Sequence, residues 1–532
     1  MNENGTGAGG EPKIGGGSKV AGILILIFVI AAVGIVVYKF LLPRIMEREQ
    51  RATSDARTDV DTIRIAGDNY LGYWFISSPE MRKRASRAGI QLQFTDDGGA
   101  YAERLRKFSN KQYDCIVLPV NSYLEHGERY KYPGVIVASI SESKGADGIV
   151  GYSDHVSTGK VNDLNDPSLL FVLTGASPSE FLLDLTIASF GLEQLGRDAM
   201  GQRPWMRAVA SSKEVYETAK RNEGDIFILW EPDLSKALEL PGMKYIFGSD
   251  QFAGYIVDVM VFHRDFVKKK PKVIQKFLRT YYRVMSYYGN QRDLMIKDMG
   301  KVSGLKKSVV EKMLDKIDWH SLSENLSLQF GIAKNVGAQV REGLVDTIIA
   351  CTDVMIQTGR FQTDPLRGDP YKIINSDFMD ELSKTTSALG ITTVGKVTFT
   401  PMTDWSRLRE IGTMRVEPIT FQTGNDMLDY NGKQAVDKIA QMLTHNFPDK
   451  RVEIRGHTGP GANEAQNVKL SQRRADAVLQ YLKAVYNIDA NRARAVGVGS
   501  SQPPPKKPGE NQRTYRYRMP RVEFILYEAN PL

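Results

Sequence analysis

The pattern of apolar and polar residues divides the chain into three parts. Residues 20–38 form an almost entirely apolar run without charge. From residue 62 to about residue 384, short apolar runs of strand length alternate with segments of helical periodicity, and a shorter α/β pattern covers residues 416–529. Strands that alternate with helices are typical of open parallel sheets. The pattern therefore predicts an α/β protein with one membrane segment.

The run at residues 20–38 has the length of a transmembrane helix. Its 19 residues would span about 28 Å as a helix, which matches the hydrocarbon core of a bilayer. Charged residues follow the run directly, whereas a cleaved signal peptide would continue into a small-residue cleavage site. We predict a transmembrane signal anchor over residues 20–42, between a flexible glycine-rich tail at residues 1–19 and a stalk at residues 43–60.

The charges beside this segment do not fix its orientation. Two basic residues precede the run and five follow it, up to residue 57, so the loop charges alone would place the bulk of the chain in the cytoplasm. Acidic residues at positions 47, 49, 55 and 59 interleave with the arginines, a pattern typical of a solvated stalk. The character of the domains therefore has to decide the orientation.

Composition and charge do not indicate a nucleic-acid-binding protein. The 532 residues are 42% hydrophobic and 25% charged, and 70 basic against 62 acidic side chains give a net charge of +8. Over so long a chain this excess does not indicate nucleic acid. The alternation of arginine and tyrosine at residues 513–518 is interpreted as a strand with its arginines outward. Cys115 and Cys351 lie in apolar patterns, so we expect two buried, unpaired thiols.

Sequence signals of catalysis are lacking. The chain has no phosphate-binding glycine loop and no Gly-x-Ser-x-Gly elbow, and its six histidines include no pair at helical spacing. We therefore expect no enzyme, no cofactor and no metal site.

Residues 61–385 carry a series of segments whose order and spacing are informative. The segments are KGADGIV at 144–150, FVLTGASPSEFLL at 171–183, DIFILWEPDLS at 225–235, and the strand with the following helix at 257–273. Together they resemble the periplasmic solute-binding proteins of the nitrate, sulfonate, taurine and thiamine-precursor class. The resemblance implies a type II periplasmic-binding-protein fold, in which two α/β lobes hold a ligand in a cleft and release it by hinge motion. Lobe 1 would comprise residues 61–145 and 256–385, and lobe 2 residues 146–255.

The cleft residues follow from the rule that open α/β sheets bind ligands at the carboxyl ends of their strands. The residues expected there are Asp68, Asn69, Tyr70, Trp74, Asn121, Ser122, Asp147, Gly175, Ser177, Ser179, Trp230 and Glu231.

The chemistry of the ligand stays open. A helix that begins near Ser177 and Ser179 would offer free amides to a carboxylate, sulfonate or phosphate. The same residues with Glu180 also form a capping box, in which Glu180 would compete for those amides. The acids of the set suit an amine-bearing ligand or cap turns, and Trp230 is either a stacking wall of the cleft or a residue that packs at the hinge.

Residues 416–529 carry a second resemblance, after a predicted linker at residues 386–415. The matching segments are ITFQTG at 419–424, RVEIRGHT at 451–458, Asn467, LSQRRA at 470–475 and RVEF at 521–524. They are similar to the OmpA-type peptidoglycan-binding domain. The resemblance implies a small α/β sandwich whose groove grips the diaminopimelate side chain of the cell wall, with His457, Thr458, Asn467, Arg474 and Arg521 as site residues.

This sequence departs from the OmpA pattern at one important position. In the family an aspartate after Gly-His-Thr pairs with the ligand's ammonium, and the arginine at the Arg474 position pairs with its carboxylate. Here the aspartate is replaced by Gly459, and Met519 and Pro520 replace the usual Asn-Arg. Wall binding could be weakened, rerouted through Glu464 or lost.

Both resemblances point to modules that work outside the cytoplasm. The sequence therefore predicts a single-pass protein of the bacterial inner membrane with its bulk in the periplasm, where it binds a small solute and contacts peptidoglycan. An ABC-type permease, a sensor and a second copy of the chain remain open as partners, and nucleic acid is not expected. The alternative is a structural tether in which the binding fold is a spacer or docking surface.

Overall fold

The structure, a computed structural model, describes most of the chain from residue 60 onward. The described residues are 60–156, 160–332, 341–385, 399–402, 404–422, 426–445, 447, 450–461, 463–486, 488–507 and 509–529, with a few isolated positions before residue 60. The predicted membrane segment at residues 20–38 lies almost wholly outside them. Within the described part, no helix has the length and apolar character that a membrane span requires.

Lobe 1 is built on a six-stranded sheet with the strand order β11-β4-β10-β3-β1-β2. The strands are β1 (Asp61–Gly67), β2 (Ile90–Asp96), β3 (Cys115–Pro119), β4 (Gly134–Ser143), β10 (Val257–His263) and β11 (Ile317–Trp319). β1 and β3 are parallel, but β10 runs antiparallel to both of its neighbours. The sheet is therefore mixed rather than parallel, because β10 brings the chain back from lobe 2.

Lobe 2 is built on a five-stranded sheet with the order β7-β6-β8-β5-β9. Its strands are β5 (Asp147–Tyr152), β6 (Phe171–Thr174), β7 (Met206–Val209), β8 (Ile226–Trp230) and β9 (Met243–Gly248). The chain crosses between the two sheets at residues 144–146 and 249–256. The crossings are tied together, because the Ser249 hydroxyl lies 2.8 Å from that of Ser143 and accepts a 2.8 Å hydrogen bond from the Gly145 N–H.

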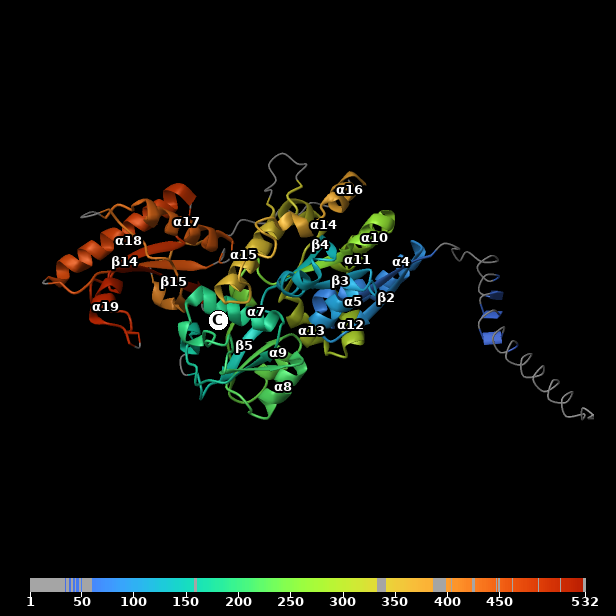
Figure 1. Cartoon of the computed structure of the whole chain (residues 1–532), viewed down its shortest axis with the longest axis horizontal. Helices are drawn as coiled ribbons and strands as arrows, with labels where there is room; N and C mark the ends of the chain where they lie inside the picture. The colour runs from blue at the N-terminus through green and yellow to red at the C-terminus, as the bar shows by residue number, and fades with distance from the viewer. Residues whose placement is uncertain are drawn as a thin grey trace, which may run out of the picture. The chain divides into compact units, whose positions relative to one another are not determined.

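Helices flank the sheets (Figure 1). Those of the two lobes are α3 (Trp74–Ser77), α4 (Pro79–Arg87), α5 (Tyr101–Ser109), α6 (Val120–Gly127), α7 (Pro178–Phe190), α8 (Ser212–Lys220), α9 (Asp233–Leu238), α10 (Arg264–Lys269), α11 (Pro271–Gly289), α12 (Arg292–Ser303), α13 (Lys307–Leu314), α14 (Leu322–Glu324), α15 (Gly343–Gln357) and α16 (Asp377–Thr385).

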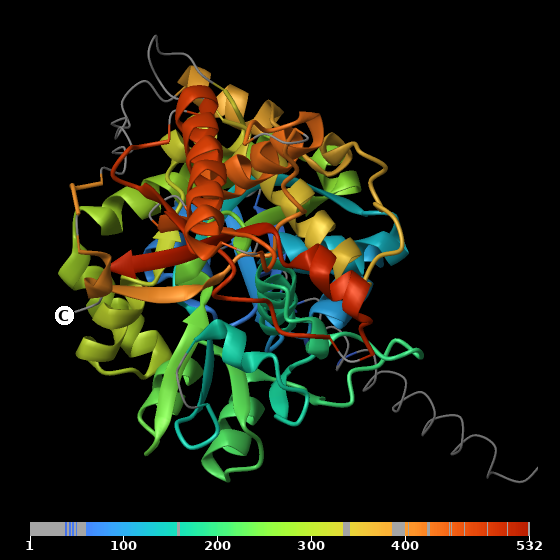
Figure 2. The same cartoon turned by 90° about the vertical axis from the view of Figure 1, so that its left-hand side faces the viewer.

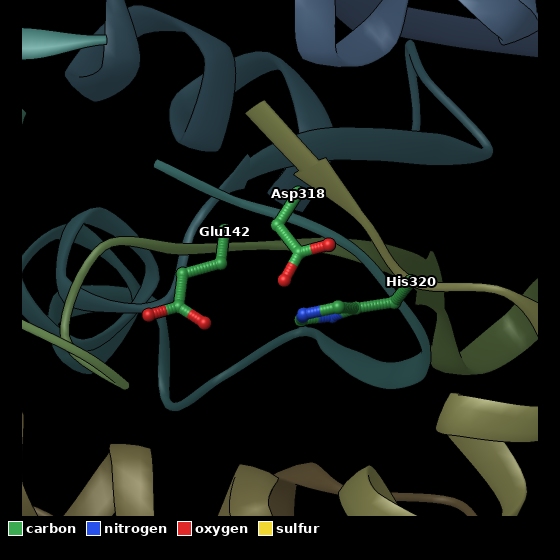
Figure 3. A group of neighbouring side chains, drawn as sticks. All are labelled: Glu142, Asp318 and His320. Atoms are coloured by element: carbon green, nitrogen blue, oxygen red, sulfur yellow. The ribbon is translucent and has the colours of Figure 1, made fainter. Parts of the chain in front are cut away.

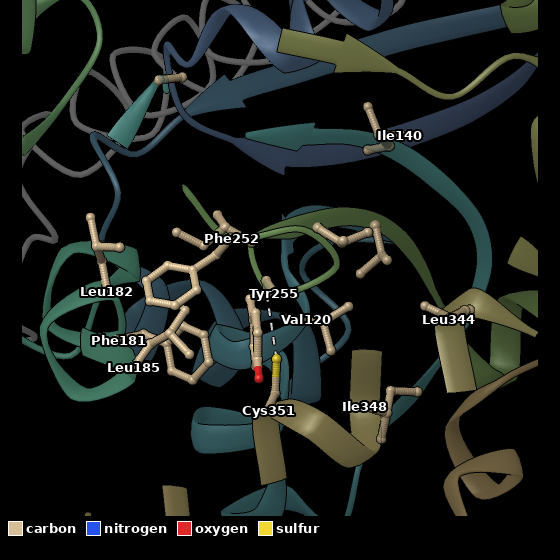
Figure 4. Packing of buried hydrophobic residues seen from close by; sticks show 14 of the residues in the cluster. Val120, Ile140, Phe181, Leu182, Leu185, Phe252, Tyr255, Leu344, Ile348 and Cys351 are labelled. Atoms are coloured by element: carbon tan, nitrogen blue, oxygen red, sulfur yellow. Dashed lines mark hydrogen bonds between the residues drawn. The ribbon is translucent and has the colours of Figure 1, made fainter. Parts of the chain in front are cut away.

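Helix α7 lies at the centre of this part of the molecule. All 13 of its residues are buried, as expected for a helix that is apolar on nearly every side. Phe181 and Leu185 of α7 pack near Val120 of α6 and Cys351 of α15 (Figure 4). Helix α15, which follows the lobe 1 strands in the chain, therefore packs against helices of both lobes. Cys351 and Cys115 are buried and unpaired, which confirms the prediction.

The C-terminal part has its own four-stranded sheet, with the order β12-β15-β13-β14. Its elements are β12 (Leu408–Thr413), α17 (Tyr430–His445), β13 (Arg451–His457), α18 (Glu464–Tyr486), β14 (Ala493–Gly497), α19 (Gln512–Arg518) and β15 (Arg521–Ala529). The long helix α18 packs on β13 and β14 of this sheet, and Figure 2 shows it in front of the strands.

Two predictions about this part were wrong. The predicted linker at residues 386–415 contains β12, which pairs with β15, and Trp405 packs against Tyr527 at 5.7 Å between ring centroids. The segment at residues 513–518 is helical rather than extended. Asn511 caps this helix by accepting a 2.9 Å hydrogen bond from the Thr514 N–H, and none of the helix residues is buried, so no inward face imposes the alternation of a strand.

Candidate ligand pocket between the lobes

A small pocket lies between residues of both lobes. Lobe 1 and the second crossing contribute Asp68, Tyr70, Tyr73, Tyr101, Pro119, Ile256 and Asp258, and lobe 2 contributes Asp147, Pro178 and Trp230. Its free volume is about 20 Å³, so the pocket is nearly closed in this arrangement of the lobes. Its lining combines three carboxylates with four aromatic rings.

The first carboxylate, Asp68, belongs to a buried ionic network at the end of β1. The Arg104 guanidinium, which is fully buried, lies 3.0 Å from Asp68 and donates a 2.7 Å hydrogen bond to Asp97. Arg104 also donates to the Val117 carbonyl oxygen at 2.5 Å. Burial raises the pKa of Asp68, and the neighbouring Arg104 charge opposes that rise. Asp68 is thus a paired charge held in place by helix α5.

The other two carboxylates are held by hydroxyl groups. Asp147 accepts a 2.6 Å hydrogen bond from Ser143, and Asp258 accepts hydrogen bonds from Tyr73 and, at 3.2 Å, from Ser141. Burial raises the pKa of Asp147 to about 7 and raises the pKa of Asp258 well above its ordinary value. These two side chains are therefore buried acids without the cationic neighbour that Asp68 has.

Aromatic rings form the walls of the pocket. Tyr70 and Tyr73 pack edge to face with ring centroids 5.4 Å apart, and the Arg104 guanidinium lies 4.7 Å from the centre of the Tyr101 ring. The Trp230 ring of lobe 2 comes so near Gly99 of lobe 1 that a Cβ atom there would lie 3.6 Å from it. The two lobes thus approach each other closely at the pocket.

The amino end of α7 is occupied by its own side chains. Ser177 accepts a 3.2 Å hydrogen bond from the Ser179 N–H and donates to the Thr174 carbonyl oxygen at 2.7 Å. The Glu180 carboxylate accepts from the Ala176 N–H at 2.8 Å. Glu180 therefore takes one of the amides that an anionic ligand would need, as the capping interpretation expects. The amide it takes belongs to Ala176, the residue before the cap residue Ser177.

The remaining predicted residues lie in different surroundings. Asn121 and Ser122 are fully buried in the first turn of α6, and their side chains, like the Ser179 hydroxyl, have no hydrogen-bond partner in the described part of the chain. Gly175 is half-buried and Asn69 is exposed. Asn69, Asn121, Ser122, Gly175 and Ser179 therefore do not line the pocket.

Trp74 and Glu231 have partners that account for their positions. Trp74 packs on Tyr288 in lobe 1, at 4.7 Å between ring centroids. Glu231 pairs with Lys316 of lobe 1 and accepts a 3.1 Å hydrogen bond from the Ser235 N–H at the start of α9. Glu231 therefore joins the lobes and caps a helix, and neither residue lines the pocket.

Sequence reasoning missed three polar residues of the pocket and the buried arginine behind it. Tyr73, Tyr101 and Asp258 line the pocket, and Arg104 holds Asp68. The signal for Asp258 was present as a lone acid inside the apolar strand YIVDVMVF, because a charged residue in a buried strand needs a partner or a function.

One cluster with the side chains of a metal site lies near the first crossing. Glu142, Asp318 and His320 offer ligand atoms within 4.8 Å of one another (Figure 3). The histidines are scattered in the sequence, and the pairing of β4 with β11 brings these three residues together. The Lys144 ammonium pairs with Asp318, and the Gly254 N–H donates to Glu142 at 2.7 Å. Asp318 is thus paired with a cation, and Glu142 accepts a backbone hydrogen bond.

A second candidate site lies in the C-terminal domain. His457 is buried with its Nε2 atom 3.0 Å from Glu523, and the Thr458 hydroxyl has no hydrogen-bond partner among the described residues. The Arg474 guanidinium lies 5.1 Å from the centre of the Phe421 ring. Burial lowers the pKa of Arg474, which means that this arginine is less well solvated than an ordinary surface arginine.

The other predicted residues of this domain are engaged with neighbours. Asn467 donates a 3.2 Å hydrogen bond to Glu464, and Arg521 donates to Glu523 at 2.7 Å. Glu464 also accepts a 2.8 Å hydrogen bond from the Ser500 N–H. A Cβ atom at Gly459 would meet nothing nearer than the Pro520 ring at 3.7 Å, so this position has room for a side chain.

Comparison with known proteins identifies the C-terminal domain. The model of the OmpA family matches residues 420–517. These residues form an OmpA-family domain. The OmpA domain is 40% identical over 85 residues to outer membrane porin F of Pseudomonas aeruginosa and 35% identical over 86 residues to outer membrane protein A of Klebsiella aerogenes. Each match covers 16% of this chain and 24% of the relative, so the chain spans about a quarter of the length of these relatives.

The region before the OmpA domain is similar in structure to periplasmic binding proteins. One is the alkanesulfonate-binding protein SsuA from Xanthomonas axonopodis pv. citri, with 15% identity and a TM-score of 0.45 over 59% of this chain and 99% of that chain. Another is the periplasmic nitrate-binding protein NrtA from Synechocystis, with 10% identity and a TM-score of 0.45 over 62% of this chain and 90% of that chain. The chain thus joins a two-lobed α/β region to a C-terminal OmpA domain.

Proposed function

We propose that the protein is a non-enzymatic receptor of the bacterial cell envelope that binds a small solute between its two lobes. The observation that carries this proposal is the pocket itself, because residues of both lobes line it. A ligand held there would contact Asp68 and Tyr73 on one side and Asp147 and Trp230 on the other. Such contacts couple ligand binding to the relative position of the lobes.

The receptor would be anchored in the inner membrane. Residues 20–38 have the composition and length of a membrane span, and the proposed orientation places everything after residue 43 in the periplasm. Two of the printed names support this orientation, because they describe a periplasmic nitrate-binding protein and an outer membrane porin. A pocket close to the membrane could serve an ABC-type permease or a sensor.

The OmpA domain would contact peptidoglycan. Arg474, partly desolvated beside Phe421, can pair with a carboxylate of a wall peptide through two parallel hydrogen bonds. Gly459 offers no partner to an ammonium group, and Glu464 is already hydrogen-bonded to Ser500. We therefore propose wall contact that is weaker than an aspartate at position 459 would give.

Native mass spectrometry of the full chain, released from detergent, tests the receptor proposal. We expect a co-purified small molecule at about one per chain. The Trp230→Ala variant should lose it, because the Trp230 ring forms a wall of the pocket. The control is Tyr371→Ala, which removes an aromatic side chain that is 54% exposed. A full chain that carries no molecule, and whose melting temperature no amine, sulfonate, phosphate or thiamine precursor raises, would refute the proposal.

One observation favours a second function, that of a rigid tether. Arg360, which follows α15, lies 2.7 Å from Glu125 of α6 and also pairs with Asp184 and Glu180 of α7. Arg203 pairs with the same Asp184. This buried ionic cluster and the apolar contacts of α15 (Figure 4) connect the lobes at one side. In a tether this connection would hold the lobes in one arrangement, with or without ligand.

A further inference from the structure

Two carboxylates of the pocket are buried without a cationic partner. Asp147 and Asp258 are 3% and 1% exposed. Throughout the described ranges, neither forms an ion pair with a lysine, arginine or histidine. A buried carboxylate that faces no positive charge costs several kcal/mol in its ionised form, roughly the desolvation penalty of one ion. The fold thus places two acids where a positively charged partner would lower the free energy of the complex.

The pocket also contains a buried hydroxyl with a weak hydrogen-bond partner. Tyr70 lines the pocket and is 9% exposed. Its hydroxyl interacts with the Ser143 side chain, but makes no hydrogen bond of ordinary length within the described part of the protein. A phenolic hydroxyl usually finds a partner when it is buried. A ligand in the pocket would supply a closer partner for this hydroxyl.

The walls favour a cation on separate grounds. Tyr70, Tyr73, Tyr101 and Trp230 present aromatic rings to the same small space. The faces of such rings attract ammonium groups, and Trp does so most strongly. Charged contacts from carboxylates and ring faces together form the kind of cage that recognises amines.

An anionic ligand would find no charged partner in this pocket. No lysine, arginine or histidine is among the described residues that line it. The nearest buried arginine, Arg104, is already bonded to Asp68, Asp97 and the Val117 carbonyl oxygen. The amino end of α7 is capped by Ser177 and Glu180. The groups that bind sulfonate or phosphate are thus absent or occupied.

We propose that the pocket binds a small organic cation, an amine or quaternary ammonium compound, between Asp147 and Asp258 and against the Trp230 and Tyr70 rings. This inference rests on the proposed receptor function and specifies the class of solute. The pocket is small, with about 20 Å³ of free volume in this arrangement of the lobes, which favours a solute of few heavy atoms.

The test measures binding to the full chain in detergent by isothermal titration calorimetry. The probes are choline, putrescine and ethanolamine, each compared with uncharged or anionic compounds of similar size, namely 3,3-dimethylbutan-1-ol, 1,4-butanediol and isethionate. We expect at least one amine to bind, and the compounds without positive charge to bind about 10 to 100 times more weakly, because they lose a charged contact. Molecules that co-purify with the chain are identified in parallel by mass spectrometry after denaturation.

Variants assign the effect to the two acids. Asp147→Asn and Asp258→Asn should each weaken binding of the amine about 10 to 100 times. Asp293→Asn, which changes a side chain that is 94% exposed, should not alter it. Because each substitution replaces a buried acid that lacks a cationic partner with a neutral amide, the ligand-free variants should melt at or above the temperature of the parent. A variant that melts lower and still binds the amine would refute the role of its carboxylate.

The outcomes separate this inference from the receptor proposal. A co-purified or titrated anion or neutral solute without a basic nitrogen would overturn the cation assignment and leave the receptor function intact. A chain that binds none of the probes and carries no molecule would overturn both. An amine whose affinity is unchanged in Asp147→Asn and Asp258→Asn would also overturn the assignment, because it would bind elsewhere.

Discussion

The Tyr73 hydroxyl donates its hydrogen bond to the carboxylate of Asp258, although 185 positions separate the two residues in the chain. The bond joins the segment after β1 to the strand that returns from lobe 2. Tyr73→Phe should lower the free energy of unfolding by about 1 to 3 kcal/mol, the range for a hydrogen bond to a charged or buried group. Thermal and urea denaturation measure this change. Tyr371→Phe is the control, because its hydroxyl bonds Glu342 on an exposed surface, and an equal loss there would contradict the prediction.

Arg104 should be among the residues most sensitive to substitution. Replacing it with methionine leaves Asp68 and Asp97 without their buried cation, and removing one partner of a buried pair costs about 3 to 5 kcal/mol. We expect Arg104→Met to lower the melting temperature strongly and to reduce ligand affinity, since Asp68 lines the pocket. Arg106 lies on the same helix and, in the described structure, pairs only with exposed Glu103. Arg106→Met should therefore change the melting temperature little. Equal melting temperatures for both variants would show that the network contributes nothing.

Asp147 should make the ligand-free protein less stable as the pH rises. Burial holds its folded-state pKa at about 7, and Glu231 and Asp68 add to the rise, whereas an unfolded aspartate titrates near pH 4. Between about pH 4 and pH 7 the folded state therefore retains a proton that the unfolded state has lost, so the free energy of unfolding falls with rising pH and levels off above pH 7. Thermal unfolding in matched buffers measures the slope.

The difference between the parent and Asp147→Asn isolates this group. Asp68 and Asp258 also have raised pKa values, Glu231 acts on Asp147 while paired with Lys316, and all of these remain in the variant. We expect the variant to lose part of the slope between pH 4 and pH 7. An unchanged slope would mean that Asp147 is ionised at low pH in the folded protein.

Gly459→Asp should strengthen binding to the cell wall. The position has room for the side chain, since a Cβ atom would lie 3.7 Å from Pro520, and a carboxylate there could pair with the ammonium of a wall peptide. We expect the fraction of protein that co-sediments with purified peptidoglycan to rise, with an affinity gain of about tenfold or more from one charged hydrogen bond.

Two substitutions on helix α18 check that this binding uses the expected site. Arg474→Gln should abolish the gain, whereas Arg473→Gln, which alters an exposed neighbour paired with Asp426, should retain it. A Gly459→Asp protein that sediments no better than the parent would show that the groove does not hold a wall peptide.

The distance between the lobes should distinguish a receptor from a tether. Spin labels at Lys83→Cys in lobe 1 and Lys220→Cys in lobe 2 would occupy exposed helix positions, while the native cysteines are buried. Because Arg360 joins α6 to α7, we expect one narrow distance in the parent and a broader distribution in Arg360→Gln. If the protein is a receptor, adding ligand to Arg360→Gln should narrow the distribution of spin-label distances again. If it is a tether, ligand should leave that distribution unchanged.

The sequence predicted pocket residues correctly where they follow the carboxyl ends of strands, the edge at which open α/β sheets bind ligands. Asp68, Tyr70, Asp147 and Trp230 were predicted at the cleft from the carboxyl ends of strands, and all four line the pocket. The same rule missed Asp258, which stands near the amino end of β10. Because β10 is antiparallel to β3, Asp258 lies opposite Pro119 at the last residue of that strand. Because β10 runs opposite to β3, its amino end lies beside the carboxyl end of β3, at the edge of the sheet that faces the pocket.

Other features depended on tertiary packing that no local pattern shows. Arg104 looks like an ordinary helix residue in the sequence, and its burial follows from the packing of α5 behind the pocket. β12 lies in a segment that begins rich in serine, threonine and glycine, so its pairing with β15 was not apparent. The OmpA segments were recognisable because they are close together in sequence, and the OmpA family model matches most of that region.

The burial of all 13 residues of α7 also bears on the order in which the protein is made. Helix α7 is synthesised with lobe 2, but α15, which covers part of it, follows about 150 residues later in the chain. At the 5 to 20 residues per second typical of synthesis, this interval is on the order of ten seconds. During this interval α7 lacks the contacts that α15 makes with it in the folded protein. A chaperone at the site of export would therefore bind α7 during this interval.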